Sequence, residues 1–263
     1  MICPIVELEK AFKNIKYYDA DHVYIDTITQ KRLISVTQAL GKIKQPFDEE
    51  KWLKIKAKER GISEEDLKKE WWIAAKVGTT RGTLLHKYME DSYSRKEYPK
   101  NYGNLENVLS ILPLIEYIQS VDSIKKMADD FIKDFPNLIP IKSEVVIGSS
   151  ELGIAGMFDQ LMYDESNDTY IIIDYKTDKD IKYTNRWANL KEPLSNLEDC
   201  QYVKYSLQLS LYKYIIEKYT KIKISELKVI WFNSKNDTYK IIPIDFLEDE
   251  IQKLIKYINN DIK

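Results

Sequence analysis

Asp174 and Lys176 are the residues whose types and spacing most directly suggest chemistry. They follow an apolar run at 171–173 in the segment "IIIDYKTD". Side chains at positions i and i+2 of a strand point to one face, so these two charges project together. A run that is apolar on both faces indicates a buried central strand, where charged side chains have partners or metal ions. The alternative is a surface ion pair, which contributes little to stability.

Asp159 supplies a second carboxylate. It lies in the apolar segment "GIAGMFDQLMY", near Gly153 and Gly156. The turn residues "ESND" allow this segment to pair antiparallel with residues 169–176, which would bring Asp159 and Asp174 together. Two like charges in a half-buried place repel each other, and a divalent cation is the natural compensation. The alternative is that Asp159 is an exposed acid on a strand.

Oxygen ligands on two strands beside a lysine suit Mg²⁺ or Mn²⁺ and phosphate chemistry. Such a metal lowers the pKa of a water molecule and screens the phosphate. Lys176 could orient that water and stabilise the charge that develops on the phosphate. The two segments therefore indicate metal-dependent phosphate chemistry.

The same segments belong to an ordered set of motifs that resembles the PD-(D/E)XK nuclease superfamily, and more narrowly its RecB-type branch. That branch carries a glutamate on one strand, then G-x-x-D, then a hydrophobic run that ends in D-Y-K-T. The corresponding residues here are Glu144, Gly156 with Asp159, and 174–177. The proline of the superfamily name is missing, since Phe158 precedes Asp159, and this branch commonly lacks it.

Two further motifs complete the resemblance. A helical histidine after a G-T turn corresponds to His86 in "RGTLLH", and a Q-x-x-x-Y helix corresponds to Gln208 and Tyr212 in "YSLQLSLY". The resemblance spans roughly residues 78–243. The N-terminal "ISVTQAL" is also similar to the family of the mitochondrial genome maintenance exonuclease and related phage and bacterial exonucleases.

The resemblance implies a set of metal ligands and catalytic residues. One or two Mg²⁺ or Mn²⁺ ions would be bound by His86, Asp159, Asp174 and the backbone carbonyl of Tyr175. Lys176 would be the catalytic lysine, acting with Asp159 and Asp174. Glu144 would support the metal or its water.

The side chains expected to contact the substrate are Gln208, Tyr212, Thr177, Arg81 and Tyr205. Arg81 lies at the start of the His86 helix, where backbone amides also point toward an anion. Taken alone, His86 would be a structural or solvated histidine, and Gln208 and Tyr212 would be the polar edge of a core helix. Glu90, one turn beyond His86, would form a salt bridge or orient that histidine.

The order of elements predicts an α/β fold. Helical segments come first, then three strands within 141–178, a helix at 201–220, two strands and a C-terminal helix. This order favours a mixed central β-sheet flanked by helices, and the resemblance implies a restriction-endonuclease-like core. We expect a single nuclease domain over residues 1–263, with a hairpin and helices at 1–77 and the core at 78–263.

Local signals predict where several elements begin and end. Residues 16–34 combine β-formers with turn residues and are typical of a hairpin. Ser35 or Thr37 is the expected N-cap of the helix that follows. A later helix is expected to end at Gly78, with a new helix after the glycine-containing turn. The helix at 201–220 is expected to be strongly amphipathic.

Composition limits the class of protein. The 263 residues are 44% hydrophobic and 31% charged, as in soluble globular proteins. No apolar run approaches membrane-spanning length, so we expect no membrane partner. The net charge of −2 means that nucleic-acid binding must use a local basic patch. Two cysteines, Cys3 and Cys200, cannot supply the four ligands of an iron–sulfur cluster, and none is expected.

These observations favour a divalent-metal-dependent DNA exonuclease that acts on ends with single-stranded character, in DNA replication, recombination or repair. One alternative is a structure- or sequence-specific endonuclease of the same superfamily. Another is a DNA-binding or assembly module without turnover. The sequence has no P-loop motif, so a helicase or other replication or recombination protein would be a separate partner. We expect a cytoplasmic protein encoded by a bacterium or a phage.

Overall fold

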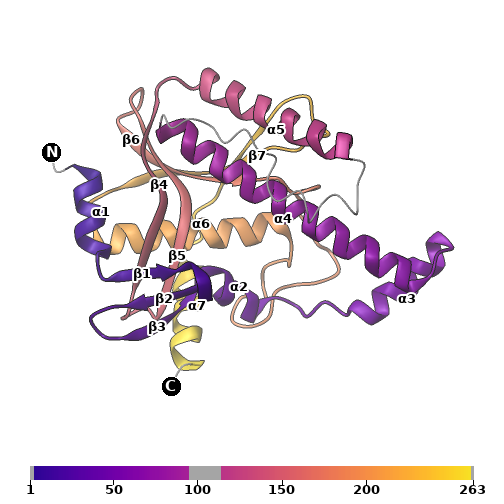
Figure 1. Ribbon diagram of the computed structural model, residues 1–263. Coiled ribbons are helices and arrows are strands. Elements are labelled where there is room, and N and C mark those ends of the chain that lie inside the picture. Colours follow the sequence, from indigo (N-terminus) through magenta and orange to yellow (C-terminus); the bar gives the residue numbers. More distant parts are fainter. Residues whose placement is uncertain (1–2, 95–113, 262–263) are drawn as a thin grey trace.

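A mixed β-sheet with helices on both faces forms the centre of the molecule (Figure 1). The computed structural model describes residues 3–94 and 114–261. The described strands are β1 (Ile15–Tyr18), β2 (Val23–Asp26), β3 (Lys31–Ser35), β4 (Leu138–Ser149), β5 (Ile154–Asp164), β6 (Thr169–Lys176), β7 (Ile224–Trp231) and β8 (Lys240–Ile244). The described α-helices are α1 (Pro4–Phe12), α2 (Val36–Ile43), α3 (Glu49–Arg60), α4 (Glu64–Ser94), α5 (Leu114–Asp134), α6 (Gln201–Tyr219) and α7 (Glu248–Asp261). The expected fold class is confirmed.

Strand β5 is the branch point of the sheet. Strand β4 pairs with it antiparallel along its whole length. On the other edge of β5, β3 pairs in parallel with its first two residues, and β6 pairs antiparallel with residues 160–164. Residues 156–159 have no ladder partner on that edge. The sheet therefore has a gap between β3 and β6, and side chains from its two faces can meet there.

Strand β6 is buried on both faces, as the isoleucine run predicts. Ile171 and Ile173 pack in a hydrophobic cluster with residues of α4 and α5. Ile172 packs in the larger cluster that includes residues of α1, α2, α6 and α7. All three isoleucines are fully buried. Parallel pairing with β7 on one edge and antiparallel pairing with β5 on the other fix the position of Asp174 and Lys176.

The helix that follows β3 begins with a capping box. The Ser35 hydroxyl accepts a hydrogen bond from Gln38 N, and the Gln38 side chain accepts one from Ser35 N. This pairing satisfies two of the backbone donors that a helix start leaves free. Of the two expected N-caps, Ser35 is confirmed. The two strands expected after the helix at 201–220 are β7 and β8, and they pair as an antiparallel hairpin.

The expected helix end at Gly78 is wrong. Helix α4 runs without interruption from Glu64 to Ser94, through both Gly78 and Gly82. The Thr79 hydroxyl donates to the carbonyl of Ala75, four residues earlier, so it bonds within the helix rather than ending it. A helical glycine costs about 1 kcal/mol relative to alanine. Packing of α4 against β4 and β6 outweighs this local preference.

Two other local predictions need correction. Residues 16–34 form a three-stranded meander, β1–β2–β3, rather than a two-stranded hairpin. Helix α6 is not amphipathic, because neighbouring elements cover most of its circumference. Only Lys204 and Lys218 are exposed among its residues, since the sheet, α2 and α7 pack around it. None of the helices in the described ranges combines the length and the apolar character needed to cross a bilayer.

Candidate active site

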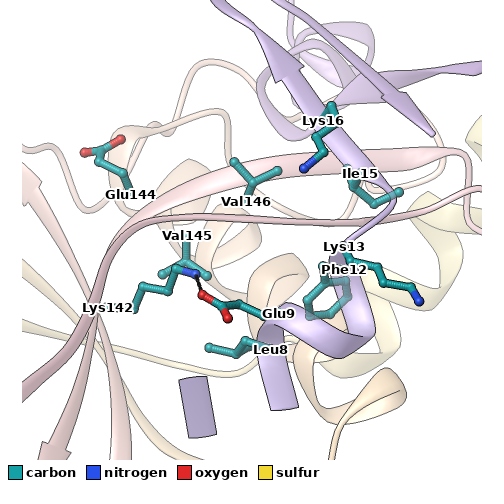
Figure 2. Close-up of a pocket in the computed structure, with 10 residues that line it drawn as sticks. All are labelled: Leu8, Glu9, Phe12, Lys13, Ile15, Lys16, Lys142, Glu144, Val145 and Val146. Carbon is teal, nitrogen blue, oxygen red and sulfur yellow. Dashed lines mark hydrogen bonds and ion pairs between the residues drawn. The ribbon is translucent and has the colours of Figure 1, made fainter. Parts of the chain in front are cut away.

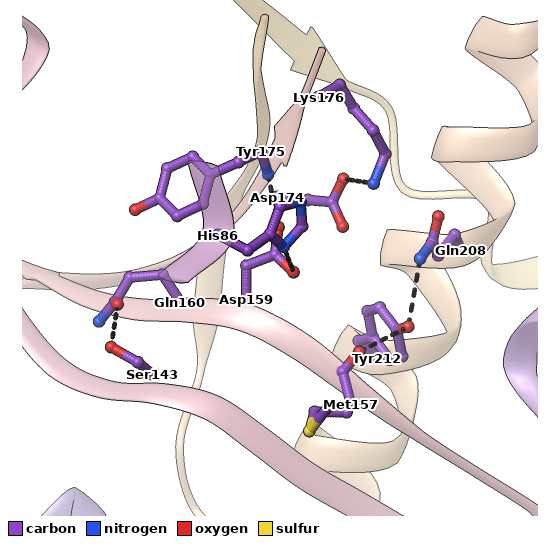
Figure 3. A network of polar contacts seen from close by, with 10 residues as sticks. All are labelled: His86, Ser143, Met157, Asp159, Gln160, Asp174, Tyr175, Lys176, Gln208 and Tyr212. Carbon is purple, nitrogen blue, oxygen red and sulfur yellow. Dashed lines mark hydrogen bonds and ion pairs between the residues drawn. The ribbon is translucent and has the colours of Figure 1, made fainter. Parts of the chain in front are cut away.

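The predicted site lies where β5 and β6 separate (Figure 3). The last ladder pair of these strands joins Gln160 to Ile173, so Asp159 and Asp174 occupy the next position on each strand. The backbone N–H of Tyr175 donates to Asp159 Oδ2 at 2.6 Å. This bond continues the strand pairing through a side chain in place of a backbone carbonyl. The two aspartates predicted to approach each other therefore occupy facing positions on β5 and β6.

Three of the predicted residues bring potential metal-ligand atoms together. His86 comes from α4, Glu144 from β4 and Asp159 from β5, and one ligand atom of each lies within 4.8 Å of the others. His86 Nδ1 is 3.2 Å from Asp159 Oδ1. The three residues are distant in the sequence, and the sheet gap lets the helix approach the strand.

Glu144 has an unusual backbone conformation. Its φ is 49°, in the left-handed region, and the ladder register on either side would place it opposite Asp159. A non-glycine residue in this conformation is uncommon and costs on the order of 1 kcal/mol or more. Such distortions in a strand re-aim a side chain. Here the distorted position is also the one whose carboxylate lies near His86 and Asp159.

The charges of these three residues are strongly coupled. Burial lowers the pKa of His86, but the adjacent Asp159 charge outweighs it and raises the pKa to about 9. Burial, followed by the charge of Asp159, raises the pKa of Glu144 to about 7. Burial also raises the pKa of Asp159, yet the His86 and Lys176 charges leave it below its usual value. The carboxylates thus crowd negative charge into a partly buried place, which a divalent cation would compensate.

Asp174 and Lys176 form a separate, buried ion pair between Lys176 Nζ and Asp174 Oδ2. Both side chains lie on the α6 side of β6, and Lys176 Nζ lies 5.2 Å from the centre of the Tyr205 ring. Burial raises the pKa of Asp174 to about 6, against the opposing effect of the lysine charge. Asp174 is not among the three residues, His86, Glu144 and Asp159, whose ligand atoms lie within 4.8 Å of one another. We call His86, Glu144, Asp159, Asp174 and Lys176 the charged group.

Gln208 and Tyr212 form neutral hydrogen bonds beside the charged group. The Tyr212 hydroxyl donates to the carbonyl of Met157 at 3.0 Å and accepts from Gln208 Nε2 at 3.2 Å. The Tyr212 side chain is buried. We call Met157, Gln208 and Tyr212 the neutral group. They close the sheet gap on the α6 side.

The motif glycine has a packing role. A Cβ added to Gly156 would lie 2.7 Å from Tyr212 Cε1 and 2.9 Å from Val36 Cγ2. Real Cβ atoms do not approach other atoms so closely, so only glycine lets α6 and α2 pack against β5 here. In the G-x-x-D motif, Gly156 therefore allows close helix packing, and Asp159, three residues later, supplies the charge.

The remaining predicted substrate residues are held by intramolecular contacts. Arg81 lies in the interior of α4 rather than at a helix start, so the expected free backbone amides are not beside it. Arg81 Nη2 donates to the carbonyl of Thr177 at 3.2 Å, which links α4 to the end of β6. Tyr205 donates its hydroxyl to Asp178 Oδ2 at 2.7 Å. Glu90 forms an ion pair with Lys87 at 2.9 Å, the first of its two predicted roles. These contacts position side chains around the site, while their roles toward a substrate stay predictions.

Asp178 makes contacts next to the site that the sequence motifs did not predict. Besides accepting from Tyr205, it accepts through its backbone carbonyl from Trp231 Nε1 at 2.7 Å and from Asn233 Nδ2 at 3.2 Å. It thereby anchors the chain directly after Lys176. The alternation of Asp174, Lys176 and Asp178 was the available signal.

The site fits a divalent metal ion. His86, Glu144 and Asp159 offer one imidazole nitrogen and carboxylate oxygens at mutual distances suited to one ion. Oxygen donors with a single imidazole suit a hard cation better than a soft one. Burial lowers the pKa of His86 and raises that of Glu144, while the nearby negative charges raise both, so positive charge is favoured at this place.

Comparison with known proteins agrees with this geometry. The family model described as the PD-(D/E)XK nuclease superfamily matches residues 63–263, which begin at the start of α4. No curated protein sequence matches the chain. Among solved structures, the chain is similar to one described as the crystal structure of SSO0001, with 15% identity, a TM-score of 0.29, and coverage of 72% of this chain and 84% of the other. A likeness at that TM-score supports no conclusion. The family match covers most of the sequence, and the chain belongs to the PD-(D/E)XK nuclease superfamily.

Proposed function

We propose that this protein is a divalent-metal-dependent deoxyribonuclease that digests DNA from ends with single-stranded character. The observation that carries this proposal is the convergence of His86, Glu144 and Asp159 beside the buried Asp174–Lys176 pair. Superfamily membership supports phosphodiester hydrolysis. The similarity of the motif order to exonucleases supports the choice of exonuclease and a role in DNA replication, recombination or repair.

His86, Glu144 and Asp159 would hold Mg²⁺ or Mn²⁺. Asp174 and the backbone carbonyl of Tyr175 remain further ligands predicted from the resemblance. A bound cation would supply a water of lowered pKa and would screen the phosphate charge. The Tyr175 N–H holds Asp159 Oδ2, so one oxygen is fixed while Oδ1 faces His86. This arrangement orients the carboxylate before any ligand binds.

Lys176 would stabilise the negative charge that develops on the phosphate in the transition state. Its ammonium is kept charged, because the effects of Asp174 and Asp159 outweigh burial and raise its pKa. The neighbouring Tyr205 ring restricts where the ammonium can lie. A fixed cation in a place with little water stabilises developing charge more than a solvated one does.

Digestion of end-labelled DNA with Mn²⁺ tests this function. Single-stranded, double-stranded and covalently closed circular substrates should be compared, with EDTA and a Lys176→Ala variant as controls. We expect linear substrates with single-stranded ends to be shortened and circles to remain intact. Cleavage of circles would indicate an endonuclease, and cleavage that is unimpaired in EDTA would remove the metal from the mechanism.

A further inference from the structure

A hollow of about 380 Å³ lies beside the charged group, between α1, the start of β1 and β4 (Figure 2). Glu144 lines this hollow at one end. Glu144 also lines a second hollow, of about 490 Å³, that includes His86 and Glu90. The two hollows share Glu144 as a lining residue, so the first one adjoins the candidate metal ligands and extends from them along β4.

The hollow follows strand β4. Within the described ranges, β4 has β5 as its only ladder partner, and α1 and β1 pack against it. Figure 2 shows Glu144, Val146 and Lys16 on one side of the β4 ribbon, so a chain lying over this face would pass from Glu144 to Lys16.

The hollow combines an apolar floor with a basic rim. Phe12 and Ile15 are buried, and Val146 is partly buried. Lys13 and Lys16 are exposed, and neither has an ion-pair partner among the residues that the structure describes.

The third lysine of the hollow is differently placed. Lys142 Nζ lies 2.9 Å from Glu9 Oε1, so its charge is already compensated. Two unpaired positive charges therefore remain above apolar surface in a protein whose net charge is −2.

We propose that this hollow binds an unpaired nucleotide of the DNA strand next to the phosphodiester held at the charged group. This proposal rests on the proposed nuclease function and specifies its substrate. Lys13 and Lys16 would each contact one of the two phosphates that flank the nucleotide, and the apolar floor would contact the sugar and base. A base in a duplex is paired and stacked and cannot enter such a hollow without the cost of unstacking. The hollow thus selects single-stranded character on this side of the site. Its volume lies within the common range of small-ligand sites, about 300–1,000 Å³.

Salt-dependent binding of a labelled single-stranded oligonucleotide tests the proposal. For single-stranded DNA, the loss of one phosphate contact reduces the magnitude of the slope of log affinity against log salt concentration by about 0.7. Lys13→Gln/Lys16→Gln should therefore lower the magnitude of this slope by about 1.4. Lys253→Gln/Lys256→Gln, which removes two exposed charges from α7, should leave the slope unchanged. An Asp174→Asn/Lys176→Met background prevents cleavage during the measurement.

Cleavage by protein with Asp174 and Lys176 intact reports separately on the nuclease function. With Mn²⁺, Lys13→Gln/Lys16→Gln should raise KM for single-stranded DNA, while the α7 control should not. An unchanged slope and KM would overturn the proposed subsite and leave the nuclease function standing. Absence of cleavage in the wild type would contradict the nuclease function, while the slope would still show whether the lysines bind the strand. A change in oligomeric state without a change in slope would assign the hollow to a protein contact and overturn the proposal.

Discussion

The charged group and the neutral group border the same gap in the sheet, yet they are built differently. In the charged group, two carboxylates depend on nearby cations, and Glu144 adds a further acid beside Asp159. In the neutral group, one buried hydroxyl is satisfied by a carbonyl and an amide. In the charged group, a metal ion could replace the proton on Glu144 or the contact between His86 and Asp159. The hydroxyl of the neutral group already has both partners, so we expect these residues to stabilise the local structure.

The contrast between the two groups gives different roles to residues that the family resemblance assigns to one site. Sequence resemblance gives Gln208 and Tyr212 roles beside the catalytic residues, as if both groups met the substrate. The structure gives Tyr212 a buried position with a carbonyl partner and places Lys176 against Asp174. We therefore expect substitutions in the charged group to affect chemistry and those in the neutral group to affect stability.

Replacing Lys176 should have the largest effect. Lys176→Ala should slow cleavage by about 100-fold or more, because a fixed charge that stabilises the transition state contributes on the order of 10²–10³. The same change leaves Asp174 without its buried partner, at a stability cost on the order of 3 kcal/mol. Asp174→Asn/Lys176→Met should recover much of that stability without recovering cleavage. Initial rates with Mn²⁺ and urea unfolding measure the two effects. A Lys176→Ala rate within about tenfold of the wild type would contradict the assignment.

Removing a metal ligand should abolish stabilisation by Mn²⁺. A ligand that binds only the folded state stabilises it by about 2.7 kcal/mol at 100 times its Kd. The melting temperature of the wild type should therefore rise with Mn²⁺, and Asp159→Asn should show no rise. Asp122→Asn, an exposed acid on α5, is the matched control and should respond like the wild type. A full response in Asp159→Asn would place the metal elsewhere.

The His86–Asp159 contact predicts a pH dependence for the metal-free protein. The folded pKa of His86 is raised to about 9 from 6.5, so its stabilisation is complete below 6.5 and is lost as pH rises through about 9. The contribution is at most about 3 kcal/mol. The stability difference between wild type and His86→Gln in EDTA should shrink across this window. His22→Gln controls for the loss of a histidine. A difference that is constant from pH 6 to pH 9 would show that the ion pair contributes nothing in solution.

The sequence predicts the parts of the site whose signals are local. The isoleucine run identifies a strand buried on both faces, and Ser35 identifies a helix start, because alternation and capping involve neighbouring residues. The helix end predicted at Gly78 is wrong, because the packing of α4 on the sheet outweighs the conformational preference of this one glycine. The left-handed conformation of Glu144 has no signal in the residue type. The Asp174–Lys176 pairing follows from their i, i+2 spacing on β6. The pairing of His86 with Asp159 depends on how α4 lies against the sheet, and local sequence patterns do not reveal it.

Tyr212→Phe should have the smallest effect, and it tests most directly whether the charged group and the neutral group have different roles. Tyr212→Phe removes the hydroxyl that donates to the Met157 carbonyl and leaves that acceptor without its partner, at a cost of about 1–2 kcal/mol. If the neutral group only holds the gap closed, the cleavage rate should change by no more than a few fold and stabilisation by Mn²⁺ should persist. Urea unfolding, initial rates and melting with Mn²⁺ should be measured on the same preparation. A large loss of rate at unchanged stability would mean that the Tyr212 hydroxyl acts on the substrate, and the division between the two groups would then be wrong.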